Sequence, residues 1–122
     1  MTKKILIVDD IFSNRLLLSS TLESIGIDSK TVENGQKAIE SLQSDNFGMI
    51  LLDIEMPVMN GIETAKYIRE EMTDEYNKLP IIALTAHNPE EYGGRINDAG
   101  FNEILSKPYS VEKLGNIIEK YL

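Results

Sequence analysis

Three short stretches of the chain contain only apolar residues, and polar segments separate them. They cover residues 5–8, 49–52 and 81–84. An unbroken apolar run of this length is typical of a parallel strand that helices cover on both faces. Residues 29–32 and 103–106 have the length of strands but are more polar, which suits the edges of a sheet. The pattern therefore predicts five strands, with the second and fifth at the edges.

Between the predicted strands, apolar residues recur at the spacing of one helical face. Boundary residues indicate the same helices. Asn60, followed three positions later by Glu63, is suited to a helix start, and so is Ser110. Gly26 and Gly100 stand where helices commonly end. The signals conflict only for the fourth helix.

The fourth helical segment has a start signal at residues 88–91, but Gly93 and Gly94 fall within its first two turns. Each glycine costs about 1 kcal/mol relative to alanine inside a helix. We therefore expect this helix to be short or mobile.

Alternating strands and helices without internal repeats predict an α/β fold in one domain, residues 1–122. A doubly wound five-stranded parallel sheet of order 2-1-3-4-5, as in flavodoxin-like folds, places both polar strands at the edges. Sites in such sheets lie at the carboxyl ends of the strands, where the chain order reverses. The residues that follow each strand are therefore the candidates for function.

Composition narrows the classes of partner. The 122 residues are 42% apolar and 26% charged, and the apolar runs are too short to span a membrane. Twelve basic and twenty acidic residues give a net charge of −8, which disfavours binding to nucleic acid or anionic membranes. The chain has no cysteine, and from its opening residues we expect no signal peptide. We expect a cytoplasmic location, with proteins or cations as partners.

Polar residues with complementary chemistry stand at the predicted strand ends. Asp9 and Asp10 follow the first strand and Asp53 the third, while Thr85 and Lys107 follow the fourth and fifth. Each alone is commonly a turn or capping residue. At one edge, however, three carboxylates repel one another unless a cation joins them, and ligands that are all oxygen favour Mg²⁺. Asp53, central among them, is then the candidate nucleophile toward phosphorus, with Thr85 and Lys107 as donors to the phosphoryl oxygens.

With these motifs the chain resembles, over essentially its whole length, the receiver domains of two-component response regulators and hybrid sensor histidine kinases. The resemblance rests on residues 5–10, 51–61, 84–86 and 106–109. It implies a phosphoacceptor signalling domain of a phosphorelay rather than a conventional enzyme. Such a domain takes a phosphoryl group onto itself from a sensor histidine kinase or a histidine phosphotransfer protein and later loses it. The downstream protein target does not follow from the sequence.

For the site, the resemblance implies that Asp53 is phosphorylated. It implies that Asp10 and Asp53 bind Mg²⁺ directly, that Asp9 helps through water, and that the backbone carbonyl of Glu55 is a further ligand. Glu55 and His87 are also candidates to control how water reaches the acyl phosphate, and a plain exposed loop histidine is the alternative interpretation of His87.

The resemblance assigns contacts with the phosphoryl oxygens to Thr85 and Lys107, and a cis peptide bond between Lys107 and Pro108. Phosphorylation is then expected to draw Thr85 inward and to shift the fourth helix, fifth strand and fifth helix between pre-existing states. The family couples this shift to an aromatic residue three positions before the lysine. This chain has Ile104 there, so the coupling is expected to differ.

Other families fit less well. A flavodoxin needs a phosphate-binding loop rich in Ser, Thr and Gly after the first strand, where Asp9 and Asp10 would repel phosphate. A phosphatase of the haloacid dehalogenase type needs a second aspartate two residues after the nucleophile, where this chain has Glu55. Within the receiver family, residues 13–15 resemble receivers of hybrid kinases. A free-standing regulator and the receiver segment of a hybrid kinase are both open, as is the oligomeric state.

Overall fold

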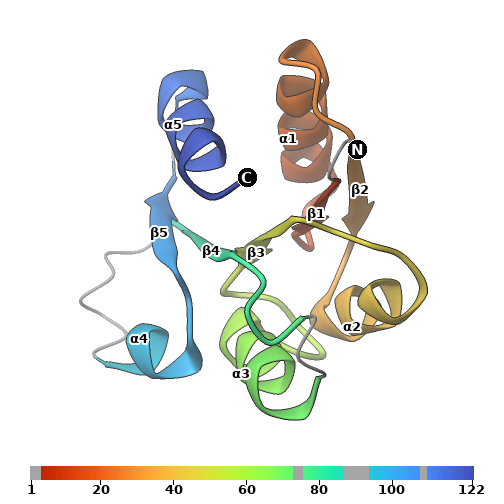
Figure 1. The fold of residues 1–122 in the computed structure, drawn as a ribbon, viewed down its shortest axis with the longest axis vertical. Coiled ribbons are helices and arrows are strands. Elements are labelled where there is room, and N and C mark those ends of the chain that lie inside the picture. Colours follow the sequence, from red (N-terminus) through yellow and green to blue (C-terminus); the bar gives the residue numbers. More distant parts are fainter. Residues whose placement is uncertain (1–3, 73–75, 87–93, 108–109) are drawn as a thin grey trace.

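The computed structural model describes residues 4–72, 76–86, 94–107 and 110–122. Within these ranges, one parallel sheet has the order β2-β1-β3-β4-β5, which confirms the predicted order (Figure 1). Its strands are β1 (Ile5–Val8), β2 (Ser29–Val32), β3 (Met49–Asp53), β4 (Ile81–Thr85) and β5 (Glu103–Ser106). The helices are α1 (Phe12–Ser24), α2 (Gly35–Ser44), α3 (Gly61–Glu71), α4 (Arg95–Ala99) and α5 (Val111–Tyr121).

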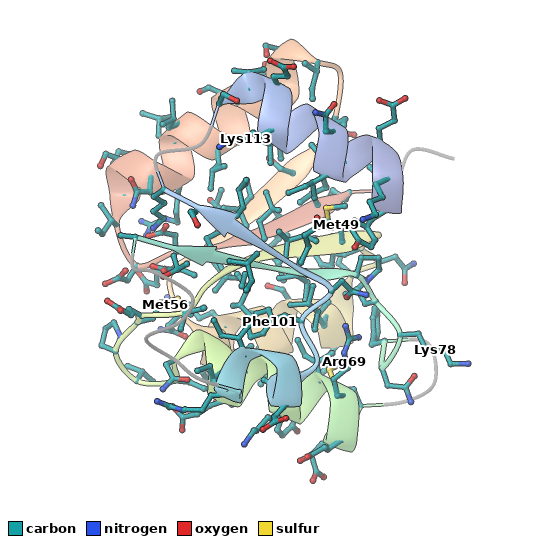
Figure 2. All side chains as sticks on the ribbon, turned by 90° about the vertical axis from the view of Figure 1, so that its left-hand side faces the viewer. Met49, Met56, Arg69, Lys78, Phe101 and Lys113 are labelled. Carbon is teal, nitrogen blue, oxygen red and sulfur yellow. The ribbon has the colours of Figure 1, made fainter. Side chains whose placement is uncertain are left out.

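Helices cover both faces of the sheet. Helices α1 and α5 lie on one face, and α2, α3 and α4 lie on the other (Figure 1). Successive strand side chains point to opposite faces, so Ile5 and Ile7 join one core while Leu6 and Val8 join the other. Figure 2 shows the two layers side-on, with α5 on one side of the sheet and α4 on the other. Among the described helices, none is both long enough and apolar enough to cross a membrane.

The helix boundaries follow the predicted signals. Asn60 and Glu63 form a capping box at the start of α3, and the side chain of Ser110 caps α5. Gly26 and Gly100 adopt φ angles of 81° and 92°, a left-handed conformation that glycine takes without steric cost. These local signals are confirmed.

The fourth helix is short, as expected: α4 has five described residues. Its predicted start signal at residues 88–91, and Gly93, lie outside the described residues. The shortness is explained at the C-terminal end by Gly100, which directly follows the last helical residue.

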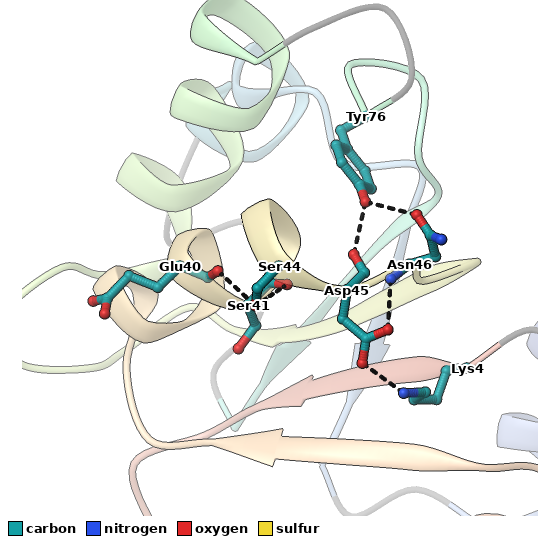
Figure 3. Close-up of polar contacts among 7 residues, drawn as sticks. All are labelled: Lys4, Glu40, Ser41, Ser44, Asp45, Asn46 and Tyr76. Atoms are coloured by element: carbon teal, nitrogen blue, oxygen red, sulfur yellow. Dashed lines mark hydrogen bonds and ion pairs between the residues drawn. The ribbon is translucent and has the colours of Figure 1, made fainter.

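Polar contacts join the loops at the amino ends of the strands (Figure 3). The Lys4 ammonium pairs with the Asp45 carboxylate at 2.6 Å. The Tyr76 hydroxyl donates to the backbone carbonyl of Asp45 at 2.7 Å and to the side chain of Asn46 at 3.2 Å. These contacts stabilise the edge of the sheet that lies opposite the candidate site.

Candidate functional site

Backbone pairing brings the predicted site residues to the carboxyl edge of the sheet. Asp9 and Lys107 directly follow their strands, as predicted. Asp53 and Thr85 were also predicted to follow their strands directly, but each is the last residue of its strand. The reason is that the ladders continue: Asp53 pairs with β4, and Thr85 pairs with Ser106 of β5. All four residues still lie at the carboxyl edge of the sheet.

Three carboxylates converge there. Asp9, Asp10 and Asp53 each offer one oxygen, and these oxygens all lie within 4.8 Å of one another. Asp9 is 0% exposed and Asp53 is 5% exposed, whereas Asp10 is exposed. The predicted convergence of the acids is therefore present, with two of them buried and the third open to solvent.

Asp9 is held at both its backbone and its side chain. Its carboxylate accepts hydrogen bonds from the backbone N–H of Ile11 at 2.9 Å and from the ammonium of Lys107 at 3.2 Å. Its backbone N–H donates to Val32 at 3.2 Å, and its carbonyl oxygen accepts from the guanidinium of Arg15 at 2.8 Å. Each carboxylate oxygen of Asp9 thus already has a protein donor.

Asp53 lies between like and unlike charges. Its Oδ1 is 3.8 Å from the Lys107 ammonium and accepts a long hydrogen bond, 3.4 Å, from the backbone N–H of Glu55. Burial raises the pKa of Asp53 to about 7, while Lys107 opposes the rise and the charge of Asp9 adds to it. A buried carboxyl whose pKa is raised this far beside other charged groups is typical of a functional site.

The remaining predicted residues differ in what the structure describes. Thr85 is 1% exposed, and the side chain of Glu55 is exposed beside the site. Ile104 is half-buried against the core between the sheet and helices α2 to α4. His87 and Pro108 lie outside the described residues, and so does the predicted cis bond.

Sequence reasoning missed the contact of Arg15 with Asp9. Residues 13–15 had indicated only a likeness to hybrid-kinase receivers. The available signal was position: a long cationic side chain one turn into the predicted first helix leans back toward the N-terminus of that helix, and therefore toward the acidic turn.

The chemistry of the donor set fits a hard cation. All three side chains offer oxygen, and neither histidine nor cysteine contributes, which is the ligand type that Mg²⁺ prefers. Two buried carboxylates and a third within 4.8 Å carry more negative charge than Lys107 alone offsets. The pocket of Asp9, Asp10 and Asp53 therefore fits a phosphoacceptor site that is shared with Mg²⁺.

Comparison with known proteins identifies the family. The model of the response regulator receiver domain matches residues 5–119. Sensor histidine kinase GacS of Pseudomonas protegens is 32% identical over 119 residues, which are 97% of this chain but 13% of the kinase. Polar-differentiation response regulator DivK of Brucella anthropi is 31% identical over 122 residues, which are 100% of this chain and 98% of DivK.

A solved structure shows the same architecture with a metal bound. The receiver domain of sensor histidine kinase PA1611 from Pseudomonas aeruginosa PAO1 is 29% identical, with a TM-score of 0.90 over 99% of this chain and 98% of that one. A magnesium ion is coordinated in its active site cleft. Since the family match covers almost the whole sequence, from residue 5 to residue 119, this chain belongs to the response regulator receiver domain family.

Proposed function

We propose that residues 1–122 form one receiver domain that takes a phosphoryl group onto Asp53 in a Mg²⁺-dependent reaction. The phosphoryl donor is a phosphohistidine of a sensor histidine kinase or a histidine phosphotransfer protein. The observation that carries the proposal is the convergence of three carboxylate oxygens within 4.8 Å beside the Lys107 ammonium. A cytoplasmic location follows from the proposed donor, because phosphohistidine proteins take their phosphate from ATP.

The acids would have different roles in binding Mg²⁺. Asp10 and Asp53 would bind Mg²⁺ directly, together with the backbone carbonyl of Glu55. Asp9 would contribute through water, as the family resemblance implies, while both its carboxylate oxygens accept hydrogen bonds from the protein. Bound Mg²⁺ supplies positive charge to the carboxylates and to the oxygens of the transferred group.

The reaction needs Asp53 as an anion. One of its carboxylate oxygens attacks phosphorus, and the new O–P bond forms as the P–N bond of phosphohistidine breaks. The imidazole leaves with the bonding electrons and takes up a proton. The Lys107 ammonium, 3.8 Å from Asp53 Oδ1, and the Thr85 hydroxyl then donate to the phosphoryl oxygens. Attack of water on the acyl phosphate later restores Asp53, so the domain catalyses changes only to itself.

The signal leaves through the elements next to Thr85. Phosphorylation adds negative charge and acceptor oxygens at Asp53, and the movement of the Thr85 hydroxyl toward them pulls on the segment after β4. We propose α4, β5 and α5 as the responding surface. Ile104, already half-buried against the core, replaces the aromatic side chain that the family uses in this coupling.

Phosphate incorporation tests the proposal. Incubation with acetyl phosphate, a small acyl phosphate donor, is followed by measurement of the intact mass with and without Mg²⁺. The wild-type chain should gain one phosphoryl group only when Mg²⁺ is present, and Asp53→Asn should gain none. Asp28→Asn is the matched control, because Asp28 is exposed and belongs to the loop before β2. Equal incorporation by Asp53→Asn, or incorporation without Mg²⁺, would contradict the proposal.

A further inference from the structure

Arg15 makes a contact that has no role in the reaction proposed above. It lies near the start of α1, and its Nη1 donates a partly buried hydrogen bond of 2.8 Å to the carbonyl oxygen of Asp9. That carbonyl belongs to the peptide group that joins Asp9 to Asp10. Because a peptide group is planar, the direction of this carbonyl constrains where the backbone of Asp10 lies. Arg15 therefore holds the acidic turn from the outside.

The turn between β1 and α1 needs such a contact. Helix α1 begins after Ile11, whose side chain makes no capping hydrogen bond, and its first turn contains no acidic residue. The Asp9 side chain accepts from the N–H of Ile11; this bond spans the backbone of Asp10, but it does not involve the carbonyl oxygen of Asp9. Asp10 is exposed, so few neighbours restrict it. The carbonyl of Asp9 is thus the place at which a side chain can orient the peptide that leads into Asp10.

The guanidinium of Arg15 is itself positioned for this role. It lies over the ring of Phe12, with 5.7 Å between its central carbon and the ring centroid. Both residues line a groove between α1 and β2, which Lys37 also borders. A planar guanidinium that stacks on a ring and donates in its own plane is more rigid than a lysine ammonium.

We propose that Arg15 is a positioning residue for Mg²⁺ binding, which aims the Asp10 carboxylate by fixing the peptide group between Asp9 and Asp10. The inference rests on the proposed function, in which Asp10 is a direct ligand. A purely electrostatic role predicts the opposite sign. A cation near a divalent ion repels it, so removal of the Arg15 charge alone would tighten Mg²⁺ binding.

Calorimetric titration with MgCl₂ separates these two roles. Arg15→Met keeps helix propensity and apolar contact but removes the donor. Its dissociation constant for Mg²⁺ should rise about tenfold, as for other residues that orient metal ligands. Arg15→Lys keeps the charge without the planar fork, and its constant should lie between those of the wild type and Arg15→Met. Lys37→Met removes one positive charge from the same groove without touching Asp9, and its constant should be unchanged or lower.

The outcomes distinguish the inference from the proposed function. If Arg15→Met binds Mg²⁺ as tightly as the wild type or Lys37→Met does, the positioning role is wrong. The same holds if Arg15→Met only lowers the melting temperature of the metal-free chain. If the wild-type chain binds no Mg²⁺, or Asp10→Asn binds it equally well, the proposed metal site is wrong, and the inference about Arg15 is overturned with it.

Discussion

Replacing Asp53 by asparagine should stabilise the metal-free domain at neutral and alkaline pH and leave it nearly unchanged in acid. Burial raises the pKa of Asp53 from its ordinary value of 3.8 to about 7. Between these two values the folded chain keeps a proton at this position that the unfolded chain has lost. Since the folded state binds more protons there, the free energy of unfolding falls as pH rises through this interval. Asparagine has no charge to bury and escapes that loss.

The size of the effect follows from the shift. A rise of roughly three pKa units corresponds to about 4 kcal/mol. Structural relaxation and solvent screening reduce this figure, so we expect about 2 kcal/mol. For a domain of this size, that difference is roughly 6–10 °C in melting temperature.

Urea unfolding of the two chains, with a chelator present, measures the effect from about pH 4 to about pH 8. The difference in free energy of unfolding between Asp53→Asn and the wild type should be near zero at the acid end and reach its full value above neutrality. Asp28→Asn, at an exposed position, should show no such trend. A difference that does not vary with pH, or that shrinks as pH rises, would refute the burial of an unfavourable charge at position 53.

Three further substitutions test the fold by urea unfolding, two at the connection from β3 to α3 and one at the opposite edge of the sheet. Val58 is 82% exposed and has a φ angle of 72°. Val58→Gly should therefore raise the free energy of unfolding by about 0.5–1 kcal/mol, because glycine adopts this φ angle without strain. Destabilisation would show that the strain is absent. A Cβ at Gly61 would meet the carbonyl oxygen of Asp53 at 2.3 Å, so Gly61→Ala should destabilise by about 2 kcal/mol or more, and a neutral result would mean that the loop adapts freely. Arg69 donates two hydrogen bonds to the carbonyl oxygen of Gly100, so Arg69→Met should cost about 2 kcal/mol, and an unchanged stability would reduce the contact to a surface feature.

The strands and their order could be predicted because both depend on burial. Residues 5–8, 49–52 and 81–84 are apolar throughout, and a strand covered on both faces buries every one of its side chains. Strand ends were less predictable. Asp53 and Thr85 continue their strands by one residue, because backbone pairing does not depend on whether the side chain is polar.

The candidate site could be predicted as a set of residues but not as a set of contacts. Topology alone brings Asp9, Asp10 and Asp53 to one edge of the sheet. The hydrogen bond of Arg15 to Asp9, and the left-handed conformation of Val58, depend on how a helix and a loop pack after the sheet has formed. The position of Arg15 in the first helix was a signal for its contact, but residue types alone give neither the length of that hydrogen bond nor the φ angle of Val58.

The central claim is that the sheet brings three acids together so that Asp53 accepts a phosphoryl group. Identification of the residue that carries the phosphoryl group tests this claim most directly. The phosphorylated chain is treated with borohydride, which reduces an aspartyl phosphate to homoserine, and its peptides are then mapped by mass spectrometry. We predict homoserine at position 53 alone, in an amount that matches the phosphate incorporated. Homoserine at position 9 or 10, or phosphate on a residue that borohydride does not reduce, would contradict the claim.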